Sequence, residues 1–194
     1  MTLKETFSKI PEDTFKQLGI NAGMLLSAFD TTDGSFEETD IIGATTGGIT
    51  FSAAPEFSDW GEDIDNCPKN TKELKRISDW TITTSGNFVT MTPELAERLA
   101  AAADNTTGHI VPRDVLDLTK DFKDIWIVGD YSDKNTGATA GFIAIHLMNA
   151  LSTTGFQIQT TDKGKMQFSF EFTAHYSIDA QDTVPFEIYV KAGT

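Results

Sequence analysis

The chain has 194 residues, and its 29 acidic against 15 basic residues give a formal net charge of −14 at pH 7. Such an acidic surface repels phosphate, so the composition argues against conventional nucleic-acid binding. No apolar run approaches the roughly 20 residues that a membrane-spanning helix needs, and the single cysteine, Cys67, cannot form a disulfide within the chain.

The N-terminal part is predicted to be an arm followed by a buried strand. Residues 1–22 form the expected arm, in which Leu3, Phe7 and Ile10 share one face of a short helix. The remaining residues, 23–194, are expected to form one β domain. Its first strand covers residues 23–29 (GMLLSAF), and the acidic stretch from 30 to 40 is typical of a solvated loop.

Two alternating segments and the loop between them follow. Apolar and polar residues alternate from Ile49 to Ser58, with Phe57 on the apolar side, and again from Trp80 to Phe88. The predicted loop between them, residues 61–79, is too long for a tight turn, and such loops are usually functional or disordered. Its charges are sorted along the chain, acidic first and basic afterwards: Glu62, Asp63, Asp65, Lys69, Lys72, Lys75 and Arg76.

The second half predicts one helix and further strands. Thr92 is a suitable N-cap before a proline and an acidic residue, and the alanine-rich run predicts a helix that continues to Ala103. Strands are predicted over residues 125–128, 142–151, 157–160, 165–177 and 186–190. Phe168, Phe170 and Phe172 are expected to face the core. The chain is therefore predicted to be mainly β.

The sequence contains no recognisable catalytic or metal-binding motif. His109, His146 and His175 are widely separated and lack the clustered spacing of zinc ligands, and Cys67 has no CxxC partner. Residues 63–66 begin like a calcium loop but lack its later glycine and glutamate. We therefore expect a protein that is not an enzyme, with no catalytic residue, cofactor or metal. An enzyme built on His146 and His175 is the alternative.

The polar faces of the three clearest strands contain no lysine or arginine, although exposed sheet surfaces commonly use long charged side chains. A wall of short hydroxyls and amides with few acids would suit a polar channel past which a polyanion slides. An ordinary threonine-rich outer face is the competing interpretation. The channel-lining candidates are Thr50, Ser52, Glu56, Thr81, Thr83, Ser85, Gln167, Ser169, Glu171 and Thr173.

Four segments of the chain resemble the major tail tube proteins of long-tailed bacteriophages. They are FKQLGINAGMLLSAFD, the run from IIGATTGG to KRISDW, FKDIWIVGDYSD, and the run from GFIAIHLMNAL to PFEIYV. The resemblance extends from about Pro11 to Val190. Its most specific parts are WGEDIDNCPKNTKELK and GFIAIHLMNALSTTGFQ, and in the second this chain has STTGFQ where the family pattern is STGGFQ.

The resemblance implies an antiparallel β-sandwich or barrel with one flanking α-helix. It implies hexameric rings that stack into the tube of a virion tail, through which the genome leaves the capsid. The implied partners are further copies of the chain and other tail proteins, such as tape measure, terminator and baseplate proteins. DNA would pass without specific binding, no membrane would take part, and the chain would be made in the host cytoplasm. On this interpretation the loop at 61–79 contacts the next ring.

Two other functions remain open. The inner tube subunit of a contractile tail, or of a tail-derived injection device, would share the same fold. A virion-associated ligand-binding β-sandwich, such as a carbohydrate-binding module, belongs to a different class and needs exposed aromatic side chains on a polar face. The tryptophans Trp60, Trp80 and Trp126 are instead expected in the core or at strand ends.

Overall fold

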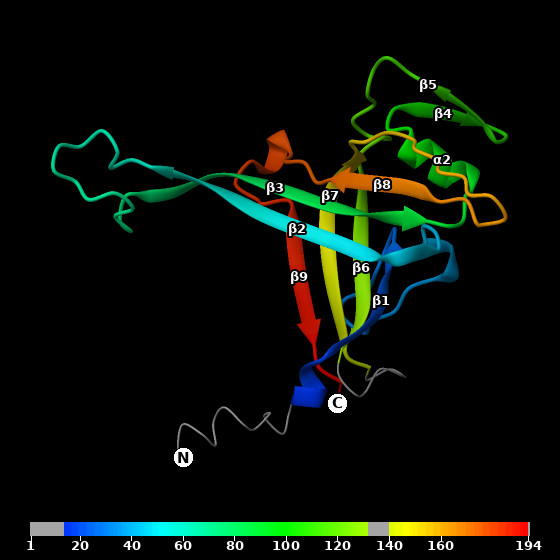
Figure 1. The fold of residues 1–194 in the computed structure, drawn as a ribbon, viewed down its shortest axis with the longest axis horizontal. Helices are drawn as coiled ribbons and strands as arrows, with labels where there is room; N and C mark the ends of the chain where they lie inside the picture. The colour runs from blue at the N-terminus through cyan, green and yellow to red at the C-terminus, as the bar shows by residue number, and fades with distance from the viewer. Residues whose placement is uncertain (1–13, 132–139, 194) are drawn as a thin grey trace. The chain divides into compact units, whose positions relative to one another are not determined.

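The structure, a computed structural model, describes residues 14–131 and 140–193 and is built mainly of strands (Figure 1). The strands are β1 (Gly19–Leu26), β2 (Thr45–Asp59), β3 (Lys75–Phe88), β4 (Ala103–Thr106), β5 (His109–Pro112), β6 (Lys123–Tyr131), β7 (Phe142–Ser152), β8 (Phe168–Thr173) and β9 (Phe186–Lys191). The helices are α2 (Pro93–Leu99) and the short 3-10 helices η1 (Thr14–Gln17), η2 (Glu38–Asp40) and η3 (Ile178–Ala180). In the described residues, no helix is long and apolar enough to cross a membrane.

Strand pairing confirms the predicted fold class. Seven strands pair in the order β1-β6-β7-β8-β3-β2 with β9 beside β7, and β4 pairs with β5 in a second sheet. The pairs β1–β6, β2–β3, β3–β8, β7–β8 and β4–β5 are antiparallel. The fold is therefore mainly antiparallel β with one α-helix among the described residues. The order of the large sheet has two ends, so it is sandwich-like and not a closed barrel.

The chain divides into two compact units. Unit 1 comprises Met1–Ile42, Ile125–His146 and Glu187–Thr194, and unit 2 comprises Gly43–Asp124 and Leu147–Phe186. The core of unit 1 is a buried cluster of Leu26, Val128, Phe142 and Ala144. Three half-buried aromatic rings pack against this cluster: Phe29, Trp126 and Tyr189. The predicted helix with Leu3, Phe7 and Ile10 lies outside the described residues, so the boundary of the N-terminal arm stays a prediction.

The phenylalanine face of β3 and β8 is the core of unit 2. Phe168, Phe170 and Phe172 are 7, 3 and 0% exposed, which confirms the face predicted to be buried. The ring centroids of Phe88 and Phe170 lie 4.4 Å apart. Gly86 lies opposite Phe170 in the register, and a Cβ atom there would come within 2.9 Å of the Phe170 ring. The absent side chain at Gly86 is what allows the Phe170 ring to approach the β3 backbone this closely.

The α2 helix begins as predicted but ends earlier. The Thr92 side chain accepts a hydrogen bond from the Leu95 backbone N–H at 3.2 Å, as an N-cap does. The helix ends at Leu99, not at the predicted Ala103. Ala101 adopts a φ of 65° and Ala103 begins β4. Pairing of β4 with β5 therefore overrides the helix propensity of the alanine run.

Other strand boundaries differ from the prediction because a strand needs a partner along its length. β1 begins at Gly19, before the predicted start at Gly23, and β8 is shorter than the predicted span of 165–177. Residues 157–160 are not a strand, since Gln159 makes only an isolated bridge to Gln167. The strands predicted over 125–128, 142–151 and 186–190 are confirmed within β6, β7 and β9.

Candidate functional site

Most of the channel-lining candidates come together on one face of β2, β3 and β8. Two rows of directly opposed residues cross these strands, Thr50–Ser85–Glu171 and Ser52–Thr83–Thr173. Directly opposed residues point to the same side of a sheet, so the two rows form one continuous surface, here called the polar face. The row between them contains Phe51, Thr84 and Phe172 and points to the opposite side, toward the core.

The polar face carries hydroxyls and acids but no base. Thr50 and Ser52 are exposed, whereas Glu171 and Thr173 are half-buried. The Thr153 hydroxyl lies 3.0 Å from the Thr173 hydroxyl and donates to Glu171 Oε1 at 3.4 Å. β2 and β8 contain no lysine or arginine, and the two bases of β3 stand at its first two positions, away from the two rows.

The remaining channel-lining candidates extend this face. Glu56 and Thr81 are exposed farther along the β2–β3 pair. Gln167 directly precedes β8, and Ser169 on β8 donates a hydrogen bond to Asn87 Oδ1 at 2.9 Å. The structure thus brings the candidates onto one surface, while their position around a channel stays a prediction.

Beyond β8, β2 and β3 continue as a two-stranded hairpin toward the left of Figure 1. The predicted loop 61–79 is too long, because residues 75–79 belong to β3 and pair with residues 56–59. Lys75 and Arg76 are therefore strand residues. Sequence reasoning missed this pairing because the segment is polar and its partner lies on the far side of the connection. Residues 57–77 are called the hairpin end below.

The connection within the hairpin end is held by its own hydrogen bonds. Asp59 accepts hydrogen bonds from the backbone N–H groups of Gly61 at 2.9 Å and Asn70 at 2.8 Å. These bonds, that of Gly61 first, hold the pKa of Asp59 below its ordinary value because they favour the charged carboxylate. Lys75 Nζ donates to Asn70 Oδ1 at 2.9 Å. The segment therefore has a defined shape without a partner.

The charged candidates of the hairpin end are exposed, except for the half-buried Lys75. Lys72 forms an ion pair with its neighbour Glu73 at 3.5 Å. Within the described part of the chain, the acidic group makes no ion pair with a base; it comprises Glu62, Asp63 and Asp65. These charges are available for a contact with another molecule, and their predicted role between rings stays a prediction.

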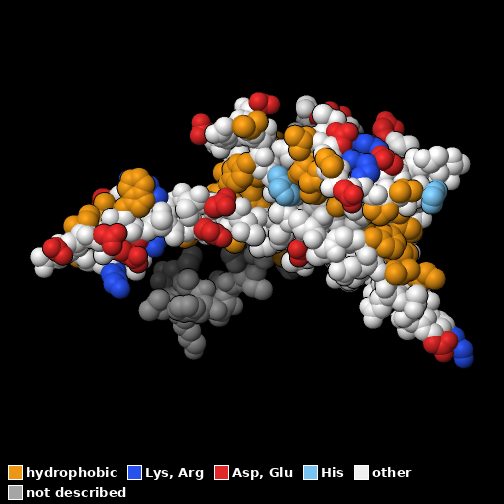
Figure 2. All heavy atoms as spheres, turned by 90° about the horizontal axis from the view of Figure 1, so that it is seen from above, with side chains coloured by type: hydrophobic (Ala, Val, Ile, Leu, Met, Phe, Trp, Pro, Cys, Tyr) orange, Lys and Arg blue, Asp and Glu red, His pale blue; other side chains and the backbone are white. Residues whose placement is uncertain are grey.

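The hairpin end also carries exposed apolar side chains that the sequence did not indicate. Phe57, Trp60, Ile64 and Ile77 are 56, 66, 52 and 53% exposed. Phe57 was predicted to face the core. Trp60 directly follows the last residue of β2, so it lies at a strand end, one of the two positions predicted for it. The register shifts between Glu56 and Phe57, and the strands there run beyond the core. Figure 2 shows hydrophobic, acidic and basic side chains together at the left end of the molecule, where this hairpin ends.

Two of the three histidines, His146 and His175, pack against aromatic rings. His146 stacks on Trp126, with ring centroids 4.0 Å apart. His175 Nδ1 lies 3.2 Å from the Asn149 carbonyl oxygen, and its ring meets Phe122 edge-on. Among the described residues, no group of three or more His, Cys, Asp or Glu side chains could hold a metal ion.

Comparisons with known proteins add little information about this chain. No protein-family model matches the sequence, and no curated protein matches it. One solved structure that is similar to this chain is the virion of a native gene transfer agent particle, with a TM-score of 0.43 and 7% sequence identity. The match covers 88% of this chain and 96% of that chain. No functional assignment follows from a likeness at this level.

Proposed function

We propose that this chain is a virion structural protein, the tail tube subunit of a long-tailed bacteriophage. Copies assemble into hexameric rings, the rings stack into a tube, and the polar face lines the channel through which DNA leaves. The proposal joins the resemblance of the sequence to one observation: a base-free polar face lies directly behind a phenylalanine core.

The polar face suits a channel because of what it lacks. DNA carries about one negative charge per 1.7 Å of its axis, so a basic wall would hold it through many phosphate contacts at once. Hydroxyls such as those of Thr50, Ser52 and Thr83 hydrate the wall without attracting phosphate. Glu171 adds weak repulsion. A wall of this kind lets DNA pass quickly and bind nowhere.

Ring closure also addresses the ends of the sheet. β1 and β2 stand at the two ends of the strand order. In the described chain no strand lies along the outer side of β2, whereas the outer side of β1 is covered at Leu25 and Leu26 by residues 41 and 42. Unpaired edges invite pairing with another chain. Pairing in a closed ring would use both edges and stop growth in that direction, as closed symmetry requires.

Electron microscopy and light scattering of the purified full chain test the proposal. We expect rings with a central opening, and tubes as the concentration rises. Phe170→Asp is the matched control, because it buries a charge in the core and should remove both the fold and the assemblies. A wild-type chain that stays monomeric at high concentration and neutral pH would overturn the proposal.

A ligand-binding module is the second candidate, and the exposed Trp60 and Phe57 favour it. Such modules use exposed aromatic rings to stack on sugars or other flat ligands. Here, however, the Arg76 guanidinium lies 5.5 Å from the Trp60 ring centroid and Lys75 Nζ lies 5.7 Å from that of Phe57. A ligand would have to displace these cations. Light scattering separates the two functions, because a binding module stays small at concentrations where a tube subunit polymerises.

A further inference from the structure

The sheet of unit 1 is apolar on both of its faces. In this unit β6 lies between β1 and β7, and β9 lies beside β7 (Figure 1). One face carries the buried cluster with Val128 and Ala144. Side chains alternate along a strand, so Ile127 and Ile143, which directly precede these two residues, point to the opposite face. That opposite face is here called the isoleucine face.

Strand β9 continues the isoleucine face. Tyr189 packs against the buried cluster, and Lys191 Nζ lies 5.6 Å from the Phe142 ring centroid, so both point to the core side. Ile188 and Val190 alternate with them and therefore lie on the isoleucine face, where they are 55 and 59% exposed. Strands that are apolar on both faces are typical of sheets that are covered on both sides. A second cover is therefore expected over this face.

A groove of about 270 Å³ lies on the isoleucine face. Three isoleucines and three glycines line most of it: Ile127, Ile143, Ile145, Gly19, Gly23 and Gly129. A Cβ atom on Gly19 would lie 3.6 Å from Ile143 Cδ1, so the first residue of β1 stands directly at the groove. Asp130 is the one charged residue among those that line it, and its carboxylate accepts a hydrogen bond from the Asn21 amide. The groove therefore suits an apolar occupant.

Residues 1–13 are the part of this chain that matches the groove. Outside the residues that the structure describes, the chain has two segments of more than one residue, 1–13 and 132–139. Residues 132–139 (SDKNTGAT) contain no large apolar side chain. Residues 1–13 contain Leu3, Phe7 and Ile10, which share one face of the predicted helix. An apolar stripe of this kind is what an open sheet face requires.

The connection between the two favours docking within one copy. Residues 1–13 run into η1, and β1 begins soon after it at Gly19, which lines the groove. Ile10 precedes Gly19 by only nine positions. A short tether gives a segment an effective concentration of the order of millimolar at its own site. A segment of another copy reaches the groove as often only at a protein concentration of that order.

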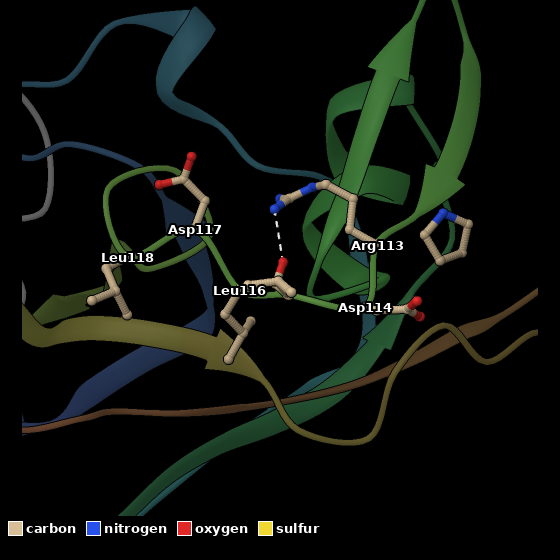
Figure 3. Close-up of a pocket in the computed structure, with 7 residues that line it drawn as sticks. Arg113, Asp114, Leu116, Asp117 and Leu118 are labelled. Carbon is tan, nitrogen blue, oxygen red and sulfur yellow. Dashed lines mark hydrogen bonds between the residues drawn. The ribbon is translucent and has the colours of Figure 1, made fainter.

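Another hollow of the described chain lies at the 112–118 loop and fits this segment less well. There Arg113 Nη1 donates to the Val115 carbonyl at 2.9 Å, as the dashed line in Figure 3 shows. Three of the seven residues that line this hollow are charged, against one of eight in the groove. Covering charged groups with apolar side chains costs free energy, because those groups lose their water. The groove is therefore the better match for residues 1–13.

We infer that residues 1–13 cover the isoleucine face of their own copy, with Phe7 and its apolar neighbours on the predicted helix turned toward the groove. The inference goes beyond the proposed function and does not depend on assembly, because a single chain contains both the segment and the face. It gives the sheet of unit 1 a cover on each side.

Photocrosslinking of the full chain tests the contact. A photoreactive phenylalanine derivative in place of Phe7 should crosslink to peptides of β6, β7 or β9, which mass spectrometry would identify. The same probe in place of Ser8 is the matched control and should give about fivefold less of these products, because the predicted helix turns that position away from the groove. A Phe7 probe that crosslinks to the 112–118 loop, or to any part of the chain other than these strands, would overturn the inference.

Mixing unlabelled chains with chains that carry a heavy nitrogen isotope identifies the copy that is covered. Each crosslinked pair should carry one isotope only, in dilute protein and in assemblies alike. Pairs of mixed isotope would show that the segment covers a neighbouring copy, which contradicts the inference and leaves the proposed function standing. Pairs of one isotope in a chain that never assembles would support the inference and contradict the proposed function.

An apolar fluorescent dye gives an independent test. Phe7→Asp should free the isoleucine face, since the groove does not favour a charge, and should raise the dye fluorescence about twofold over the wild-type chain. Ser8→Asp adds the same charge to the same segment and should leave the fluorescence unchanged. Circular dichroism should show both variants folded. Equal fluorescence of the two variants would mean that Phe7 covers no apolar surface.

Discussion

Replacing Glu171 by lysine is the sharpest test of the polar face, because it changes the channel wall without touching the core. Glu171 lies on the outer side of β8, between the buried Phe170 and Phe172. Its side chain receives one long hydrogen bond from Thr153, at 3.4 Å. Glu171 is half-buried, and loss of that bond together with the change of a polar side chain should cost about 1 kcal/mol of unfolding free energy. Tubes should form normally.

The effect on DNA passage should be large, because a hexameric ring repeats the substitution six times. In a hexameric ring, six lysines would face the channel, and about six phosphate contacts give a binding constant that falls with roughly the fifth power of the salt concentration. Between about 50 and 200 mM salt, retention should weaken about a thousandfold. Particles that carry Glu171→Lys should therefore eject DNA slowly or incompletely at low salt and recover at high salt.

The measurement is DNA release from purified particles, followed by dye fluorescence over a range of salt concentrations. Asp162→Lys is the matched control, since it makes the same charge change at an exposed turn outside β2, β3 and β8. It should release DNA at the wild-type rate. Normal ejection by Glu171→Lys particles at low salt would show that Glu171 does not face DNA, or that wall charge does not limit the passage.

Three further predictions concern the core, the helix and the hairpin end. Phe170→Ala should lower the free energy of unfolding by about 3–5 kcal/mol in denaturant titrations, because it empties a packed site beside Phe88, and a change below about 1 kcal/mol would place Phe170 outside the core. Thr92→Ala should cost about 1 kcal/mol in the same titrations, whereas Thr92→Ser, which keeps the hydroxyl cap, should cost much less. Lys72→Glu combined with Lys75→Glu and Arg76→Glu should shorten tubes in electron micrographs while single rings persist, and long tubes at physiological salt would remove the hairpin end from ring stacking.

Short sequence patterns were sufficient to predict the features that depend only on residues close together in the sequence. The period of two along residues 49–55 and 168–173 placed the phenylalanines inside and the hydroxyls outside, because side chains alternate along any paired strand. The start of α2 was equally predictable, since Thr92 needs only the backbone N–H of Leu95 to act as a cap. These are contacts that a short stretch of sequence contains in full.

Boundaries set by distant partners were not predictable in the same way. Residues 75–79 look like a polar loop, yet they are strand because residues 56–59 lie beside them. Residues 157–160 look like a strand, yet no second strand accompanies them beyond the Gln159–Gln167 bridge. The exposure of Phe57 follows from a shift in register at Glu56, which alternation alone does not reveal.

The exposed apolar side chains between Val111 and Leu118 were missed for a different reason. Val111, Val115, Leu116 and Leu118 follow neither a period of two nor one of 3.6. An apolar segment without a period predicts neither a helix nor a strand, so the sequence pattern assigns no element to these residues. The structure supplies what the pattern lacks, namely that Arg113 and Asp121 hold the loop from within while the apolar side chains stay outside.

The net charge of −14 and the proposed self-assembly place opposite demands on the surface. Copies of such a chain repel one another at long range, which keeps the free subunits dispersed. At physiological salt this repulsion fades beyond about 8 Å, so contacts at short range decide whether copies bind. Four of the 15 bases, Lys69, Lys72, Lys75 and Arg76, lie on the hairpin end beside the acids Glu62, Asp63, Asp65 and Glu73, so pairs of opposite charge can form there between copies at short range. None stands on the polar face, where the same attraction would hold DNA. The sorting of a few bases thus separates the surface that must bind from the surface that must not.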